Sequence, residues 1–482
     1  MEHIIHNFAQ GSLFACTEQL FKQLNIELHS SENLPILPQD FFDKELYRPE
    51  NKIYQLIKQL YVAGMVGTEE DSLAVIAVEL DSTAATRTQL STITRLINRQ
   101  AKGMPVAVLF RYGNHIALAN AERTQYKQTY REGEKIGKVS ILKDIDTLKP
   151  HRGHLDILET LKIPAKIETF RDLYAHWQEV FNVSTLNKKF YNELFAWFQW
   201  IISEEVGVTY PNDTQTDQDD RVQLEEQVIR LITRVLFVWF IKQKHLVPNK
   251  LFEQDELHNI LKDFEPNSLR NGNYYNAILQ NLFFATLNKK ITERAFAKVV
   301  NNRDIKTLYR YADMFAISEE EVIALFAPIP FLNGGLFECL DKDKNNDGVR
   351  YHLDGFSRNS TISKNNGHYT HRTFIPNAVF FDPEKGLFPL LNRYHFTIEE
   401  NTPNEVQVAL DPELLGNVFE NLLGAFNPET KESARKQSGS FYTPKEVVNY
   451  MVDESLKAYL RNQLPAFSAE SIDALFEEEE LP

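Results

Sequence analysis

Leu73-Ala74-Val75-Ile76-Ala77-Val78 is a short apolar run that closes on the acidic residues Glu79 and Asp81. An uninterrupted apolar run of this length is typical of a strand that is buried on both faces of a sheet. A helical stretch follows, in which Leu90, Ile93, Leu96 and Ile97 recur at helical spacing. A second strand over 106–110 and a hairpin through Tyr112-Gly113-Asn114 into 116–118 come next. The order strand, helix, strand, strand predicts an α/β domain.

From about residue 170 the pattern becomes helical. Residues 186–202 are crowded with aromatic side chains, which we interpret as core, and 223–244 and 274–287 are apolar enough to be buried helices. Residues 341–373 are polar and irregular, and helical signals return after 401. We therefore expect three domains: an α/β domain over 1–165, a helical connector over 166–400 with an irregular loop near 341–373, and a further helical part over 401–482.

Composition limits the class of protein. The 482 residues carry a formal net charge of -15, which argues only weakly against DNA, because an acidic protein can still hold a local basic channel. Two cysteines make no disulfide framework. The N-terminus has no apolar signal core, and the most apolar segment, 228–241, is interrupted by two arginines. We expect a cytoplasmic protein without a membrane segment.

The start of a helix is predicted within the stretch Ser438-Gly439-Ser440-Phe441-Tyr442-Thr443-Pro444-Lys445-Glu446. Thr443 is a helix cap, Pro444 takes the first helical position and Glu446 completes a capping box. Val448, Met451, Val452 and Tyr459 supply an apolar helical face behind the cap. A helix N-terminus favours anions, and aromatic rings beside it can stack on a planar base. On these grounds alone, a well-capped structural helix is the interpretation that we favour.

The same stretch resembles the amino-terminal side of adenine-specific DNA methyltransferases, together with 414–423 and Ala434-Arg435-Lys436-Gln437. The resemblance is strongest to type IIG restriction enzymes, in which nuclease, helical linker, methylase and target-recognition parts share one chain. It implies that 401–482 is the front of a class I methyltransferase domain and that 1–165 is a nuclease-like domain, active or degenerate. It also implies that Gly439, Phe441, Tyr442 and Thr443 help to form the wall of an S-adenosylmethionine pocket. Segments near 103–111, 279–284, 331–339 and 400–403 resemble the front and middle of the same proteins.

Two methylase motifs of that family do not occur in these 482 residues. One is an Asp-Pro-Ala-Cys-Gly-Ser-Gly type loop, which grips the methionine part of the cofactor. The other is an Asn-Pro-Pro-Tyr loop, which holds the flipped adenine. Positioning is most of what such an enzyme contributes, so we expect that this chain alone does not methylate DNA. The implied partners are double-stranded DNA and, unless the chain is a truncation, a second polypeptide that carries the rest of the methylase and the target-recognition domain.

A nuclease of the Asp…Glu-x-Lys kind binds Mg²⁺ through carboxylates, and Asp71 and Glu79 flank the first strand at suitable spacing. The residue two positions after Glu79 is Asp81 instead of Lys, and Lys102 or Arg95 would have to replace it. The alternative is that Glu79 and Asp81 simply end a strand of a degenerate or unrelated α/β domain, and this is the interpretation that we favour.

Three weaker patterns have ordinary structural explanations. Residues 343–354 match the spacing of a calcium loop, but position eight is Arg350, and a polar surface loop explains them. The histidine pairs His151/His154 and His368/His371 are interpreted as exposed loops, and we assign no metal site. Arg230 and Arg234 are expected to pair with Glu225 or Glu226 in preference to phosphate.

Three functions remain open. The chain is the front of a methyltransferase–nuclease, or a non-catalytic accessory module that binds DNA or a partner in a restriction or phage-defence system, or a relic without activity. Finding the two missing motifs on a co-purifying chain favours the first. Salt-sensitive DNA binding without S-adenosylmethionine binding favours the second. An exposed apolar patch near 447–460 with poor solubility favours the third.

Overall fold

The structure, a computed structural model, describes most of the chain. The described residues are 1–67, 72–101, 104–125, 134–163, 170–210, 220–298, 306–332, 334–341, 354–356, 373–399, 401–402, 405–410, 412, 414, 416, 445–465, 467–473 and 475–476. The chain forms two compact units, Met1–Leu415 and Gly416–Pro482. Each unit is described by itself.

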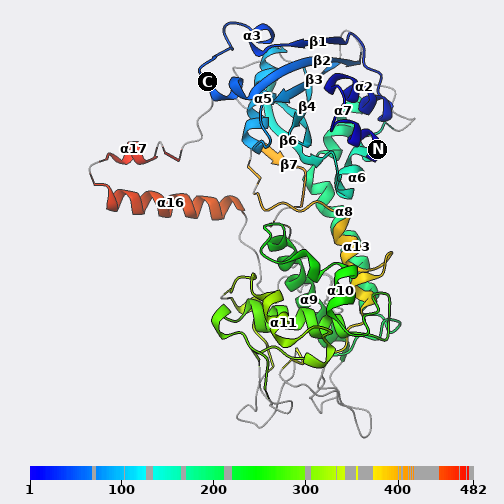
Figure 1. The fold of residues 1–482 in the computed structure, drawn as a ribbon. Coiled ribbons are helices and arrows are strands. Elements are labelled where there is room, and N and C mark those ends of the chain that lie inside the picture. Colours follow the sequence, from blue (N-terminus) through cyan, green and yellow to red (C-terminus); the bar gives the residue numbers. More distant parts are fainter. Residues whose placement is uncertain are drawn as a thin grey trace. The chain divides into compact units, whose positions relative to one another are not determined.

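The first unit contains a seven-stranded sheet whose strands lie side by side in the order of the sequence (Figure 1). Two neighbouring pairs, β3–β4 and β6–β7, are parallel, and the other four are antiparallel. The strands are β1 (Glu32–Ile36), β2 (Ile57–Gly67), β3 (Ser72–Leu80), β4 (Val106–Tyr112), β5 (His115–Gln125), β6 (Glu134–Asp146) and β7 (Glu405–Gln407). The predicted α/β character is confirmed, with β3, a helix, β4 and β5 following one another as expected.

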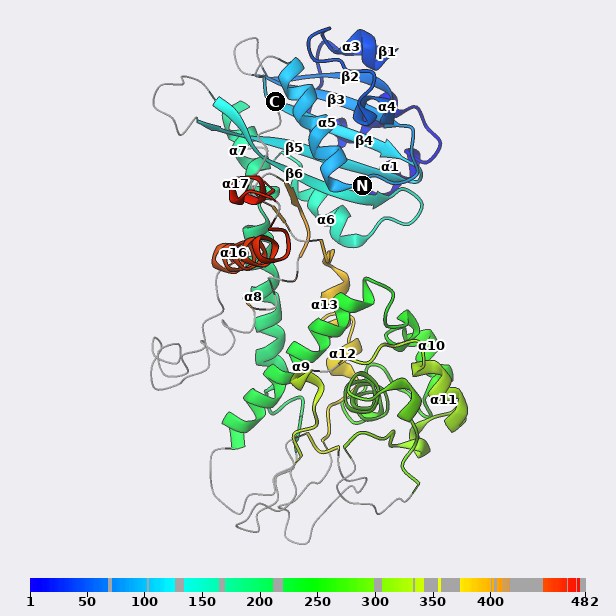
Figure 2. The ribbon, with the colours of Figure 1, turned by 90° about the vertical axis from the view of Figure 1, so that its left-hand side faces the viewer.

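Both faces of this sheet are covered, which explains the uninterrupted apolar run in β3. Leu73, Val75 and Ala77 belong to a core that includes helices α1, α2, α6 and α7, whereas Ala74, Ile76 and Val78 belong to the core beneath α5. Figure 2 shows α5 lying across its face of the sheet. The covering helices are α1 (Glu2–Asn7), α2 (Leu13–Gln23), α5 (Arg87–Gln100), α6 (Arg152–Thr160) and α7 (Phe170–Val180), with the short α3 (Pro38–Phe41) and α4 (Lys52–Leu56) before β2.

Helix α5 makes the crossover between the parallel strands β3 and β4. It begins with a capping box between Thr86 and Gln89. At the same end, the Arg87 Nε lies 3.3 Å from a Glu405 carboxylate oxygen, and Thr88 donates to the same atom at 2.8 Å. These contacts join β7 to the start of α5. Strand β7 nevertheless lies in the segment that we assigned to the third domain.

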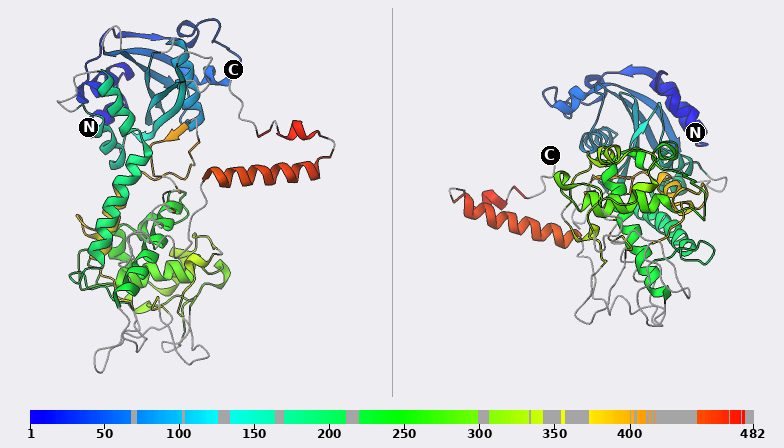
Figure 3. Two further views of the ribbon diagram at one scale, coloured as in Figure 1. Left: turned by 180° about the vertical axis from the view of Figure 1, so that it is seen from behind. Right: turned by 60° about the horizontal axis from the view of Figure 1, so that its bottom comes forward.

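The helical part of the first unit begins with α8 (Val183–Ile201), which contacts α7 and α13 (Figure 3). The aromatic stretch in α8 is core as expected, since Phe190, Trp197 and Phe198 are buried. The remaining helices are α9 (Asp220–Lys242), η1 (Asn249–Leu251), α10 (Gln254–Ile260), η2 (Tyr275–Leu287), η3 (Ile291–Glu293), η4 (Ala312–Met314), α11 (Glu319–Phe326), η5 (Gly335–Phe337), α12 (Ala378–Phe381) and α13 (Leu387–Asn392).

Helix η2 is a π-helix with every residue buried. Its buried amides are satisfied by distant parts of the chain: Asn276 donates to Thr373 O, Gln280 to Asp354 O and Asn281 to Arg310 O. Buried amides cost free energy unless they find such partners. The apolar pattern predicted the helix, and these bonds fix loop segments around it.

In the second unit the described residues form α16 (Lys445–Gln463) and α17 (Ala469–Asp473). An ion pair between Arg461 and Asp473 joins the two helices at 2.5 Å. The helix predicted after Thr443 is therefore confirmed. Seven of its apolar side chains are between 42% and 67% exposed: Val447, Val448, Tyr450, Met451, Val452, Leu456 and Tyr459.

Candidate functional site

Glu79, the candidate nuclease carboxylate, lies near the end of β3 on the face that carries α1 and α2. One of its oxygens accepts from Arg111 Nη2 at 2.9 Å and from Gln59 Nε2 at 3.1 Å. Arg111 also donates to Gly11 O at 2.6 Å, and the side chains of Arg111 and Glu79 are only 17% and 16% exposed. This Glu79–Arg111 pair holds the loop before α2 against β3 and β4.

The charges of Arg111 and Glu79 contribute to the pKa values of the neighbouring Cys16 and Tyr61. Burial raises the pKa of the Cys16 thiol, against the opposing effect of Arg111. Burial also raises the pKa of the Tyr61 hydroxyl, and the Glu79 carboxylate adds to that effect. Both groups therefore stay protonated near neutral pH, and neither provides a nucleophile.

Among the described residues, no other member of the candidate nuclease set lies beside Glu79. Asp71 and Lys102 lie outside them, and Asp81 is exposed after the end of β3. Arg95 lies in α5, where burial lowers its guanidinium pKa and Glu405 opposes that shift. Within the described ranges, no three His, Cys, Asp or Glu side chains are arranged to hold a metal ion.

The candidate cofactor residues Gly439, Phe441, Tyr442 and Thr443 all lie outside the described residues, as does most of 414–437. The structure describes the chain again from Lys445, the first residue of α16. The chemistry of the stretch, two rings and a capped helix start, suits a planar base beside a charged group. Their role as the wall of an S-adenosylmethionine pocket stays a prediction.

The interpretation of Arg230 and Arg234 was right for one residue and wrong for the other. Arg230 pairs with Glu226, with 3.5 Å between Nη2 and Oε2. Arg234 instead pairs with Asp354, with 2.7 Å between Nη1 and Oδ1, and both side chains are buried. Sequence spacing finds partners one helical turn apart, but it cannot find a partner more than a hundred residues away.

Asp354 is also the twelfth position of the calcium-loop pattern. Its Oδ2 accepts from the Leu340 amide at 2.7 Å, while Oδ1 is held by Arg234. Both carboxylate oxygens thus have protein donors, so Asp354 is not a free calcium ligand. The other positions of the pattern, 343–353, lie outside the described residues.

The interpretation of His151 and His154 as an exposed loop is wrong. His151 caps α6 by accepting from the Gly153 amide at 3.0 Å, and His154 lies inside α6 with 1% of its surface exposed. The loop was predicted from Gly153, because glycine usually marks a loop, but Gly153 lies within α6. The second pair, His368 and His371, lies outside the described residues.

These observations define a mixed α/β architecture, a seven-stranded sheet with helices. Among proteins of known annotation, the chain is similar to one from Methanocaldococcus jannaschii whose name reads "Putative type II restriction enzyme and methyltransferase". The two are 25% identical over 252 residues, which are 51% of this chain and 15% of that relative. The similarity supports a coarse relationship to restriction–modification methyltransferases.

The other two comparisons add nothing to this relationship, since no protein-family profile and no solved structure matches the chain. As to membranes, no helix among the described residues is both long and apolar enough to cross one.

Proposed function

We propose that this chain is the N-terminal part of a restriction–modification DNA adenine-N6 methyltransferase of the type IIG kind. The observation that carries the proposal is the similarity to a restriction enzyme and methyltransferase, joined to the Phe441-Tyr442-Thr443-Pro444 stretch directly before α16. The match spans a small part of that relative, so the activity of the whole protein comes to this chain as a proposal. Residues 1–165 would be the nuclease-like domain and 166–400 the connector.

In this function S-adenosylmethionine supplies the methyl group. The rings of Phe441 and Tyr442 would stack against its adenine, and the Thr443 cap would fix the start of α16 beside it. The loops that grip the methionine part and the flipped base are absent from these 482 residues. Sequence outside these 482 residues, whether a continuation of this chain or a second polypeptide, would supply them and would dock on the apolar side of α16.

The chain by itself is expected not to methylate DNA. Without the two loops neither the donor nor the target amine is positioned, and positioning contributes most of the rate. The measurement is incorporation of label from S-adenosylmethionine into mixed-sequence DNA, with an active adenine methyltransferase as the assay standard. Incorporation by the chain alone contradicts this expectation.

The proposal itself is tested by adding a polypeptide that carries both missing loops, encoded either by the continuation of this gene or by a gene that adjoins it. Methylation that appears only in the mixture, and falls in Tyr442→Ala but not in Tyr442→Phe, supports it. If neither the continuation of the gene nor an adjoining gene encodes a polypeptide that activates the chain, the proposal is wrong.

The second candidate is a non-catalytic module that binds DNA or a partner. It needs a partner surface, and the exposed apolar side chains on α16 offer one, whereas the same side chains together with poor solubility would indicate a relic without activity. This function requires that S-adenosylmethionine does not bind saturably, and in its DNA-binding form it requires DNA binding that weakens steeply with salt. Equilibrium binding of each ligand to the purified chain separates the two candidates.

We also expect the front domain not to cut DNA, because Glu79 is committed to Arg111 and Gln59. Wild type, Glu79→Gln and the exposed control Glu45→Gln should leave supercoiled plasmid equally intact in Mg²⁺. Glutamine is used because it retains an acceptor for Arg111 and so protects the fold. Mg²⁺-dependent nicking that Glu79→Gln abolishes and Glu45→Gln retains would instead establish the nuclease, with Asp71 as the next residue to test.

A further inference from the structure

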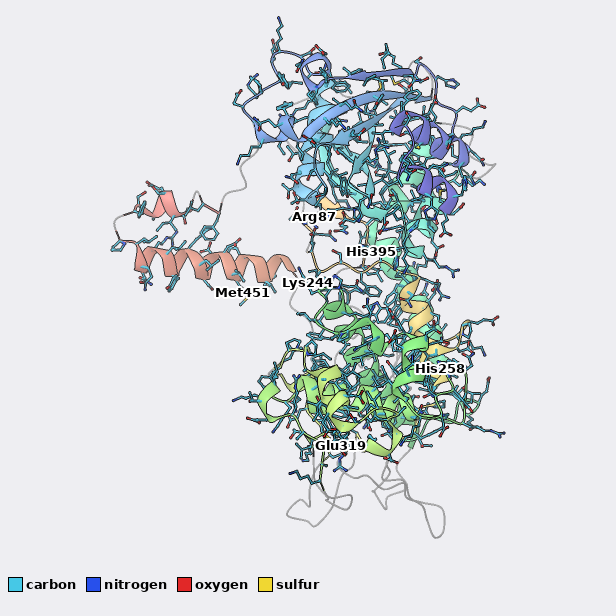
Figure 4. All side chains as sticks on the ribbon, viewed as in Figure 1. Arg87, Lys244, His258, Glu319, His395 and Met451 are labelled. Carbon is cyan, nitrogen blue, oxygen red and sulfur yellow. The ribbon has the colours of Figure 1, made fainter. Side chains whose placement is uncertain are left out.

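Three histidine rings meet where α6 contacts the segment that follows α13. The centroids of His154 and His395 are 4.3 Å apart, and His151 lies 5.7 Å from His395 and 5.9 Å from His154. His151 and His154 belong to the start of α6, which covers the sheet, whereas His395 lies between α13 and β7. This histidine cluster therefore joins two segments that are far apart in the sequence (Figure 4 labels His395).

The backbones of the two segments are in close contact at this point. A Cβ atom on Gly153 would lie 2.8 Å from both Arg393 O and His395 N. The His395 carbonyl accepts from the Leu410 amide at 2.8 Å, which links the segment onward to the residues that follow β7. The cluster thus lies at a tightly packed joint.

The central ring, His154, is buried without hydrogen bonds. Neither Nδ1 nor Nε2 has a partner among the described residues. A neutral imidazole carries one donor and one acceptor, and burying them unpaired already costs free energy. A charged imidazolium in the same place costs far more, especially with two other imidazoles beside it.

The charged groups around the cluster come from four elements. At His151, Lys242 of α9 disfavours the protonated ring and Asp156 of α6 favours it. At His395, Lys143 of β6 disfavours the protonated ring and Asp144 of the same strand favours it. His115 of β5 acts against a charge on His154. The lysines and aspartates oppose one another, so burial decides the outcome.

Burial lowers the pKa of all three histidines. The pKa of His395 falls to about 4, that of His154 lies well below its usual range, and that of His151 is lowered. Since the folded pKa values lie below the unfolded value of about 6.5, the folded joint is stable above pH 6.5. That stability is lost as the pH falls from 6.5 towards 4.

We propose that the histidine cluster is an acid-sensitive lock, which holds α6 to the segment 393–397 while its imidazoles are neutral and releases that segment when they are protonated. Protonation is the chemistry we assign, because no three potential ligands in the described part of the chain are arranged around an ion. The lock is independent of the methyltransferase proposal, since it involves none of the residues assigned to cofactor or DNA.

The test compares the pH dependence of stability and of local opening. From its pKa of about 4, His395 alone should lower the folding equilibrium constant roughly 20-fold between pH 7 and pH 5. His395→Phe should lose that dependence, whereas His3→Gln, a change at an exposed histidine of α1, should keep it. Urea unfolding at a series of pH values measures both.

Hydrogen exchange then locates the opening, and it needs only the wild-type chain if a variant fails to fold. On acidification, amides of α6 and of 393–397 should lose protection before those of α5. Equal loss of protection across these elements, or an unchanged pH dependence in His395→Phe, overturns the proposal. So does a rise in stability on adding Zn²⁺ that His154→Phe abolishes, which would make the cluster a metal site.

Discussion

Replacing Arg234 with methionine is expected to lower the free energy of unfolding by about 3–5 kcal/mol, the cost of leaving one partner of a buried ion pair without the other. The side chains of Arg234 and Asp354 are 4% and 1% exposed. Methionine keeps the apolar stem of arginine, so the loss reports the charge and its hydrogen bonds. The midpoint of urea unfolding, followed by tryptophan fluorescence to which Trp239 in the same helix contributes, measures the change.

The size of this effect follows from the number of groups that Arg234 satisfies. Besides Asp354, it donates to Leu336 O at 2.9 Å and to Glu338 O at 3.1 Å, and its guanidinium lies over the Phe284 ring. Removing it leaves the buried Asp354 carboxylate and two partly buried carbonyls without this donor. The helical part would lose the contact that ties α9 to the loop around η5.

Arg230 provides the matched control, one turn earlier in α9. Its partner Glu226 is 59% exposed, and an exposed pair of this kind contributes about 0–1 kcal/mol. Arg230→Met should therefore change the free energy of unfolding by less than about 1 kcal/mol. The double variant Arg234→Met/Asp354→Leu should regain much of the lost stability, because no uncompensated charge remains. An equal cost for the two single arginine variants would contradict the assignment.

Sequence patterns predicted those parts of the fold whose signal is local. The apolar run of β3, the heptad-like spacing of α5 and the glycine turn before β5 each carry their own period or turn residue. Strand β1 was not predicted, since it is an almost fully exposed edge strand that contains Pro35. Strand β7 was not predicted either, because three residues carry no period and its place in the sheet depends on Arg87, more than three hundred residues away.

In the candidate sites too, features with a local sequence signal were predicted and features that depend on distant residues were not. The helix behind Thr443 was predicted from its cap, and α16 confirms it. The partner of Arg234 and the third member of the histidine cluster lie far from their neighbours in the sequence, so no local spacing could indicate them. His154 occupies an ordinary helical position in the sequence, and only the fold shows that no side chain or backbone atom of the described residues forms a hydrogen bond with its ring nitrogens.

Gly153→Ala is expected to destabilise the first unit, although glycine to alanine in a helix usually stabilises. The usual gain is about 0.4–1 kcal/mol, from the smaller freedom of the unfolded chain. Here the added Cβ would meet two backbone atoms, Arg393 O and His395 N, at 2.8 Å. Backbone cannot turn aside as a side chain can, and overpacking of this kind costs about 1–3 kcal/mol. The steric term therefore exceeds the entropic gain, and the free energy of unfolding should fall.

Gly335→Ala is the matched control, because nothing lies within 4 Å of its added Cβ. That variant should leave the free energy of unfolding unchanged or raise it slightly. Gly153→Ala should also move the acid opening of α6 to higher pH, since a joint that is already pushed apart needs fewer protons to separate. If Gly153→Ala instead stabilises the chain, α6 and the segment 393–395 are free to move apart, and the histidine cluster cannot act as a lock, because a lock requires that the two backbones be held together in the neutral state.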